Sequence, residues 1–110
     1  MQIQRAISLL AALLLGLYAA QAVADDEDKG EKIVKTTCGL CHLTGTAGAP
    51  IVGSKPDWAP RIAQGKATLY EHALKGYEGK NGAMPAKGGN ATLSDDDVKA
   101  AVDYLVKKGS

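Results

Sequence analysis

Two thiols and an imidazole lie close together in segment 38–42, which reads Cys-Gly-Leu-Cys-His. At helical spacing, Cys41 follows Cys38 by three residues and His42 follows it by four, so the three side chains project from nearly one face. Covalent attachment of a c-type haem needs this arrangement, because two sulfurs add to two vinyl groups and an adjacent imidazole reaches the iron. The motif predicts one covalently attached haem c per chain, with thioether links at Cys38 and Cys41 and with His42 as an axial iron ligand.

Three other uses of these side chains remain open. A disulfide between Cys38 and Cys41 would close too short a loop to stabilise much. A thioredoxin-like dithiol would open a helix after a strand, whereas this motif closes a predicted helix with no strand before it. A zinc site would need a fourth ligand, and the chain offers only His72, with no further cysteine. We favour covalent haem over these alternatives.

A methionine and a second histidine are the candidates for the other axial position. Met84 lies in a glycine-rich segment, where Pro85 favours an extended backbone and the glycines let the chain pass close to a flat ligand. The alternative for Met84 is a core-filling side chain, for which a glycine-rich turn is a poor place. His72 lies on a predicted helix, where histidine more often packs or faces solvent. We therefore predict Met84 as the sixth ligand. Histidine–methionine ligation raises the reduction potential and leaves no vacant position on the iron, which indicates electron transfer rather than oxygen activation.

Four predicted helices must position these groups. The first has one face formed by Gly30, Ile33, Val34, Thr37, Cys38 and Cys41. The second begins near Asp57, a plausible N-cap, and stops at Gly65, and the third runs from about 66 to 75 and ends at Gly76. Glycine-rich loops at 43–54 and 76–91 connect the helices, and no stretch alternates convincingly as a strand. The pattern predicts an all-α domain with long loops.

The last predicted helix has the clearest boundaries. Ser94 caps it and Asp97 follows three residues later, a relative of the capping box. An apolar stripe follows, and Lys107 and Lys108 precede the terminal Gly109. The stripe consists of Val98, Ala101, Val102 and Leu105.

The composition indicates a small domain that needs a large apolar group. The chain has 110 residues, no Phe and one Trp, with 45% hydrophobic and 23% charged residues, which excludes a disordered polymer. Two cysteines cannot form a disulfide-dense scaffold, and a net charge of +1 gives no reason to expect nucleic acid. A haem would supply core that the missing Phe residues do not.

The first 24 residues have the layout of a secretory signal peptide. A single positive charge, Arg5, precedes a mostly apolar stretch, and Ala-Val-Ala at 22–24 precedes the acidic segment 25–28. The alternative is an uncleaved anchor, for which the apolar stretch is short. We predict a signal peptide at 1–24 and one domain at 25–110, located in the periplasm after crossing the inner membrane.

These motifs together resemble a monohaem class I cytochrome c, and in particular the bacterial cytochrome c5 group. The resemblance covers essentially all of 25–110, and its strongest parts are the haem motif at 38–42 and the segments 45–50, 58–62, 82–89 and 100–105. It implies the class I cytochrome c fold, with about four helices and long glycine-rich loops around one covalent haem.

The resemblance also implies roles for individual residues. Gly30 is the glycine at which the terminal helices cross, against the aromatic Tyr104. Pro50 corresponds to the proline whose carbonyl accepts the proton of the haem histidine. Trp58 and Arg61 correspond to residues near the haem propionates. For these two, ordinary helix packing and a solvated charge remain the alternatives.

The function implied is that of an electron carrier, not an enzyme. One haem c with His42 and Met84 as axial ligands would shuttle single electrons between periplasmic or membrane redox partners in a respiratory chain. The partners would be cytochromes or oxidase and reductase complexes, with no nucleic acid, and a membrane only if the leader is retained. We expect a monomer or a weak dimer. A haem enzyme or sensor with an open sixth site, and a fixed subunit of a redox complex, are the alternatives.

Basic residues gather in the middle of the chain. The segment 43–91 contains six basic and three acidic residues, whereas the flanking segments are net acidic. The resemblance implies that these residues surround the haem, so we expect a positive region there that orients acidic partners. Scattered solvating charges, with apolar docking around the haem rim, are the alternative. The six basic residues are Lys55, Arg61, Lys66, Lys75, Lys80 and Lys87.

Overall fold

The computed structural model describes residues 25–110, and the predicted leader at 1–24 lies outside the described residues. Residues 25–33 are α-helical and continue into a π-helical turn, η1 (Val34–Cys38), and a short helix, α2 (Gly39–His42). The π turn closes with the Gly39 N–H donating to the Val34 carbonyl, five residues earlier. The six residues of the predicted face are all buried or partly buried, but the α-helix gives way to a π turn that ends at Cys38, the first residue of the motif. π turns of this kind are frequent at functional sites.

Three further helices complete the helical part. They are α3 (Lys55–Ile62), α4 (Lys66–Lys75) and α5 (Asp95–Gly109). The predicted bounds of α4 are confirmed, and α5 begins with the predicted capping box between Ser94 and Asp97. The predicted N-cap of α3 is wrong: Ser54 caps it, since its hydroxyl accepts from the Asp57 N–H at 3.4 Å, and Asp57 lies inside the first turn.

The glycine-rich loops contain more structure than the sequence predicts. Two short 3₁₀ turns, η2 (Thr46–Gly48) and η3 (Ala86–Gly89), lie in them. An antiparallel hairpin, β1 (Tyr77–Gly79) and β2 (Gly82–Met84), also forms, with Tyr77 opposite Met84. The hairpin is largely exposed on both faces, so no alternation of apolar and polar residues marks it.

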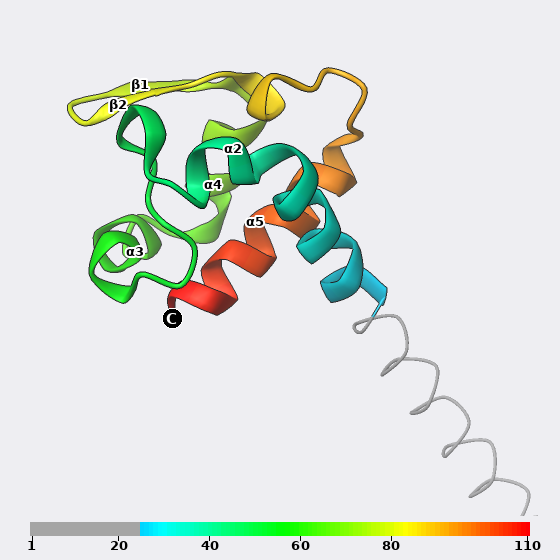
Figure 1. The fold of residues 1–110 in the computed structure, drawn as a ribbon, viewed down its shortest axis with the longest axis horizontal. Helices are drawn as coiled ribbons and strands as arrows, with labels where there is room; N and C mark the ends of the chain where they lie inside the picture. Colours follow the sequence, from blue (N-terminus) through cyan, green and yellow to red (C-terminus); the bar gives the residue numbers. More distant parts are fainter. Residues whose placement is uncertain (1–24) are drawn as a thin grey trace, which may run out of the picture.

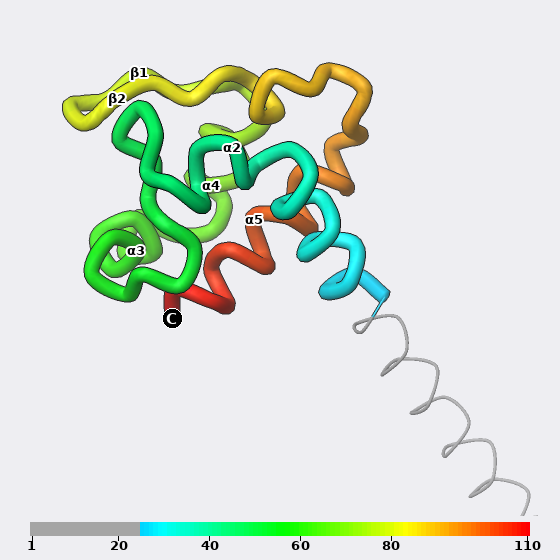
Figure 2. The backbone as a smooth tube through the Cα atoms, viewed as in Figure 1, coloured from blue at the N-terminus to red at the C-terminus, as the bar shows by residue number. Residues whose placement is uncertain are grey.

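The helices pack around α5, with the hairpin along one side of the domain (Figure 1). The first helical segment crosses α5 at Gly30, where a Cβ atom would lie 2.3 Å from the Ala100 carbonyl oxygen and 3.2 Å from the Tyr104 Cβ. Only glycine allows this approach, which confirms the predicted crossing of the terminal helices. The backbone trace shows the C-terminal end beside α3 (Figure 2), where Gly109 packs against Trp58.

Two apolar clusters form the core, and the apolar stripe of α5 contributes to both. The first has Val34, Trp58, Ala101 and Leu105 at its centre, with Cys38 packed against it. The second has Ala73, Val98 and Val102 at its centre, with Met84 packed against it. Within residues 25–110, no helix combines the length and the apolar character needed to cross a bilayer.

Candidate haem site

The two cysteines of the motif are not joined by a disulfide, and both are half-buried. Burial raises the pKa of the Cys38 thiol, which keeps it in its neutral form. Gly39, between the cysteines, is buried, and a Cβ atom there would lie 2.8 Å from the Val34 carbonyl oxygen. The second residue of the motif therefore has to be very small for the π turn to place Cys38 beside the first cluster. The sequence pattern does not mark Gly39 for this role.

The imidazole of His42 is buried and oriented by a backbone carbonyl. Its Nδ1 lies 2.9 Å from the Pro50 oxygen. Because a carbonyl only accepts, Nδ1 carries the proton and Nε2 presents a lone pair. Burial lowers the pKa of His42; the Pro50 bond opposes this, and the nearby charge of Arg61 adds to it. The neutral ring with a free Nε2 is the form in which histidine binds a metal.

The loop that carries the Pro50 carbonyl is held at Ile51 and Val52. The Ile51 N–H donates to the Asp57 carboxylate at 3.1 Å, and the Ile51 carbonyl accepts from the Trp58 indole N–H at 2.9 Å. The Val52 N–H donates to the His42 carbonyl at 2.7 Å. The start of α3 thus fixes the loop that orients the histidine. The sequence pattern does not mark Asp57 and Ile51 for this role, because the contact is between the loop and a helix turn.

Trp58 and Arg61 both lie on the His42 side of the domain. The Trp58 ring is 6.0 Å from the His42 ring, at an interplanar angle of 26°. The Arg61 guanidinium donates to the Asp57 carbonyl at 2.6 Å, within the same helix. The indole N–H is already engaged by Ile51, and the Arg61 charge acts on His42.

Met84 packs against the second cluster, and His72 lies on α4 beside the hairpin that carries Met84. Met84 has the extended backbone that the sequence predicts, as the last residue of β2, and it is partly buried. The His72 ring stacks on Tyr77 of the hairpin, with ring centroids 4.0 Å apart. This stacking was not predicted from the sequence, and it gives the imidazole a packing role.

The donor set fits a haem better than a bare metal ion. Within the described part of the chain, no three histidine, cysteine or carboxylate side chains converge to hold an ion. A haem brings four nitrogen ligands of its own, so the protein has to supply only axial groups and thioether sulfurs. Two free thiols, a neutral imidazole with a free Nε2 and one thioether meet that requirement.

The chain is similar to known proteins over nearly all of residues 25–110. Residues 25–105 match the family model described as "Cytochrome C oxidase, cbb3-type, subunit III". Cytochrome c-555 of Chlorobaculum tepidum is 51% identical over 90 residues, covering 82% of this chain and 83% of that protein. Cytochrome c5 of Azotobacter vinelandii is 41% identical over 76 residues, covering 69% and 89%.

The chain is a monohaem class I cytochrome c. Its fold is also that of a solved structure described as "Crystal structure of electron transfer complex of nitrite reductase with cytochrome c". That chain superposes with a TM-score of 0.66 at 38% identity, over 74% of this chain and 95% of its own length. The cytochrome c therefore binds haem c covalently and carries electrons, and the class I cytochrome c fold predicted from the sequence is confirmed.

Proposed function

We propose that this cytochrome c shuttles single electrons in a respiratory chain with His42 and Met84 as the axial ligands of its haem iron. Cys38 and Cys41 would hold the haem through thioethers. The bound haem supplies the Fe(II)/Fe(III) couple. The observation that carries the proposal is the His42 ring, whose Nδ1–H is engaged by the Pro50 carbonyl at 2.9 Å and whose Nε2 is free to bind iron.

Met84 is the better candidate for the second axial position. It is the only methionine in the described residues, and its strand ends in the glycine-rich loop beside the second cluster. The other histidine, His72, is stacked on Tyr77 and carries out a packing role there. A thioether opposite an imidazole occupies both axial positions of the iron, which favours outer-sphere electron transfer over ligand chemistry.

We assign Trp58 and Arg61 to the propionate side of the haem. Arg61 supports this assignment, because its charge lies close enough to lower the pKa of His42. Trp58 contributes apolar surface there, while its indole N–H orients the Pro50 loop through Ile51.

We also propose a periplasmic location and partners that are redox proteins. The sequence of 1–24 supports the location, and a similar chain is described in an electron-transfer complex with nitrite reductase. The chain matches cytochrome c-555 and cytochrome c5 over 83% and 89% of those proteins' lengths. We take this similarity to small cytochromes as support for a freely diffusing carrier over a fixed subunit. N-terminal sequencing of the exported protein tests this: a start near residue 25 supports the free carrier, and a retained leader overturns it.

The ligand assignment is tested by paired variants of the reduced holoprotein. Met84→Ala opens the sixth position, so added carbon monoxide binds and the reduction potential falls. His72→Ala leaves the haem spectrum unchanged and carbon monoxide excluded. Carbon monoxide binding in His72→Ala but not in Met84→Ala would assign the ligand to His72 instead.

A further inference from the structure

Lys87 has a backbone conformation that few lysines adopt. It follows Met84 by three residues, in the 3₁₀ turn η3, and its φ is +54°. A side chain with a Cβ atom raises the energy of this left-handed region, so the position is held by contacts elsewhere. Gly88 and Gly89, which follow, also have positive φ but carry no Cβ.

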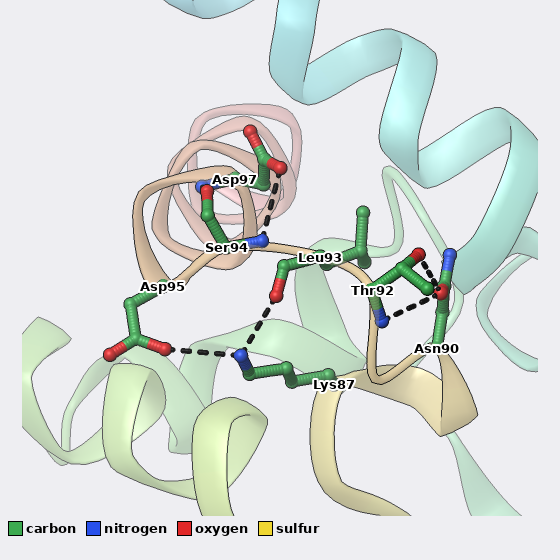
Figure 3. Close-up of polar contacts among 7 residues, drawn as sticks. All are labelled: Lys87, Asn90, Thr92, Leu93, Ser94, Asp95 and Asp97. Atoms are coloured by element: carbon green, nitrogen blue, oxygen red, sulfur yellow. Dashed lines mark hydrogen bonds and ion pairs between the residues drawn. The ribbon is translucent and has the colours of Figure 1, made fainter.

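The Lys87 ammonium group bridges two parts of the segment that leads into α5 (Figure 3). It donates to the Leu93 carbonyl at 2.8 Å and lies 3.2 Å from the Asp95 carboxylate. Only 24% of its side chain is exposed, in contrast to 75% for Lys75 on α4. A lysine that is largely buried and makes both a hydrogen bond and an ion pair has a structural role rather than a solvating one.

The turn after Met84 is tied to the same contacts. The Gly88 N–H donates to the Pro85 carbonyl, and the Asn90 N–H donates to the Lys87 carbonyl, each at 3.1 Å. Beyond them, the Asn90 side chain accepts from the N–H and the hydroxyl of Thr92 (Figure 3). On the other side, Gly76 lies so close to Met84 that a Cβ atom at Gly76 would be 3.1 Å from the Met84 carbonyl oxygen. The Lys87 contacts therefore attach the C-terminal end of the loop that carries Met84 to the start of α5.

We propose that Lys87 is a positioning residue for Met84, which fixes the methionine loop to the start of α5 and so holds the thioether at the iron. This inference rests on the proposed histidine–methionine ligation. Loss of the ammonium group would remove the tie between the methionine loop and the start of α5, and the thioether would leave the iron more often.

The test measures how often Met84 leaves the iron. Ferric holoprotein is mixed with saturating imidazole, which can bind only after Met84 dissociates, and the rate is followed by the loss of the weak red absorption of methionine-ligated haem. We expect Lys87→Ala to raise this rate roughly tenfold, the effect of losing a charged hydrogen bond. Asp95→Asn, which leaves the Leu93 bond in place, should raise it less, and Lys87→Arg should restore most of the wild-type rate.

Two controls separate positioning from general stability. Lys75→Ala removes an exposed lysine with an ion pair to Glu71 and should leave the rate unchanged. Gly30→Ala destabilises the helix crossing at Ala100 and should lower the melting temperature without raising the rate. An unchanged rate in both Lys87→Ala and Asp95→Asn would overturn the inference while the ligation stands. A wild-type protein without the methionine absorption would overturn both.

Discussion

The Nδ1 of His42 and the carbonyl oxygen of Pro50 lie 2.9 Å apart, and the next residue along the loop, Ile51, is bonded at both of its backbone groups. A carbonyl fixed in this way selects one tautomer of the imidazole and increases the electron density at Nε2. The reduction potential should therefore respond to residues that touch neither the haem nor the histidine.

Asp57 provides the test of that relationship. Asp57→Ala removes the acceptor of the Ile51 N–H, loosens the Pro50 carbonyl and weakens donation from His42, which raises the reduction potential by tens of millivolts. Asp57→Asn removes the same charge but keeps a side-chain oxygen as acceptor. The difference between the two potentials, measured by redox titration, isolates the hydrogen bond. Equal potentials in both variants would mean that the charge alone matters.

Gly30 lies where the terminal helices cross and where the structure leaves no room for a side chain. Gly30→Ala places a Cβ atom 2.3 Å from the Ala100 carbonyl oxygen, so the helices must separate. We expect a melting temperature lower by roughly 5–10 °C, even though alanine favours helix formation. Lys32→Ala, an exposed change on the same helix, is the control. A melting temperature that is unchanged or raised by Gly30→Ala would contradict the close crossing.

Tyr70 should add a pH-dependent contribution to stability at alkaline pH. Burial, with the hydrogen bond to Asp103, raises the pKa of Tyr70 from 10.0 to about 12. A folded-state pKa above the unfolded value gives stability that is complete below pH 10.0 and is lost as pH rises toward about 12. The difference in unfolding free energy between wild type and Tyr70→Phe, measured by denaturant titration, should shrink across that window. A difference that stays constant would contradict the raised pKa.

The predicted positive region around the haem depends on fewer lysines than the sequence suggests. Lys66 and Lys75 are paired with Asp103 and Glu71, and Lys87 with Asp95. Lys80, in the exposed turn of the hairpin, has no ion pair among residues 25–110. Lys80→Gln should slow association with an acidic redox partner at low salt, and more than Lys75→Gln does. The rate difference should fade by about 0.2 M salt, where the screening length is below roughly 10 Å. Equal rates in the two variants would favour apolar docking.

Local chemistry explains which parts of this cytochrome c the sequence could predict. The bounds of α4 are set by the glycines that flank it, and the start of α5 is set by Ser94 and Asp97. These signals lie within a few residues of the helix ends, so the local sequence predicts them. The haem motif depends on the types and spacing of five consecutive residues. The crossing at Gly30 was expected from the resemblance to class I cytochromes c and not from a local pattern, and the structure explains it, because only glycine leaves room for the second helix.

Other features depend on contacts that no local pattern records. Ser54 and Asp57 are both good cap residues, and Ser54 becomes the cap while the Asp57 carboxylate binds the Ile51 N–H across a loop. The π turn that ends at Cys38 changes the rotation of the helix, and it requires the close approach of Gly39 to the Val34 carbonyl oxygen. The covered position of Lys87 follows from the path of the chain between Met84 and α5, which the sequence does not specify.

The proton spectrum of the reduced holoprotein tests the proposed His42 and Met84 ligation most directly. A methyl group held against the haem face lies in the shielding region of the ring current, so the Met84 methyl should give a three-proton resonance far upfield of all other methyl signals. Met84→Ala should remove this resonance, and His72→Ala should keep it. A wild-type spectrum without such a signal, or a signal that survives Met84→Ala, would contradict the account.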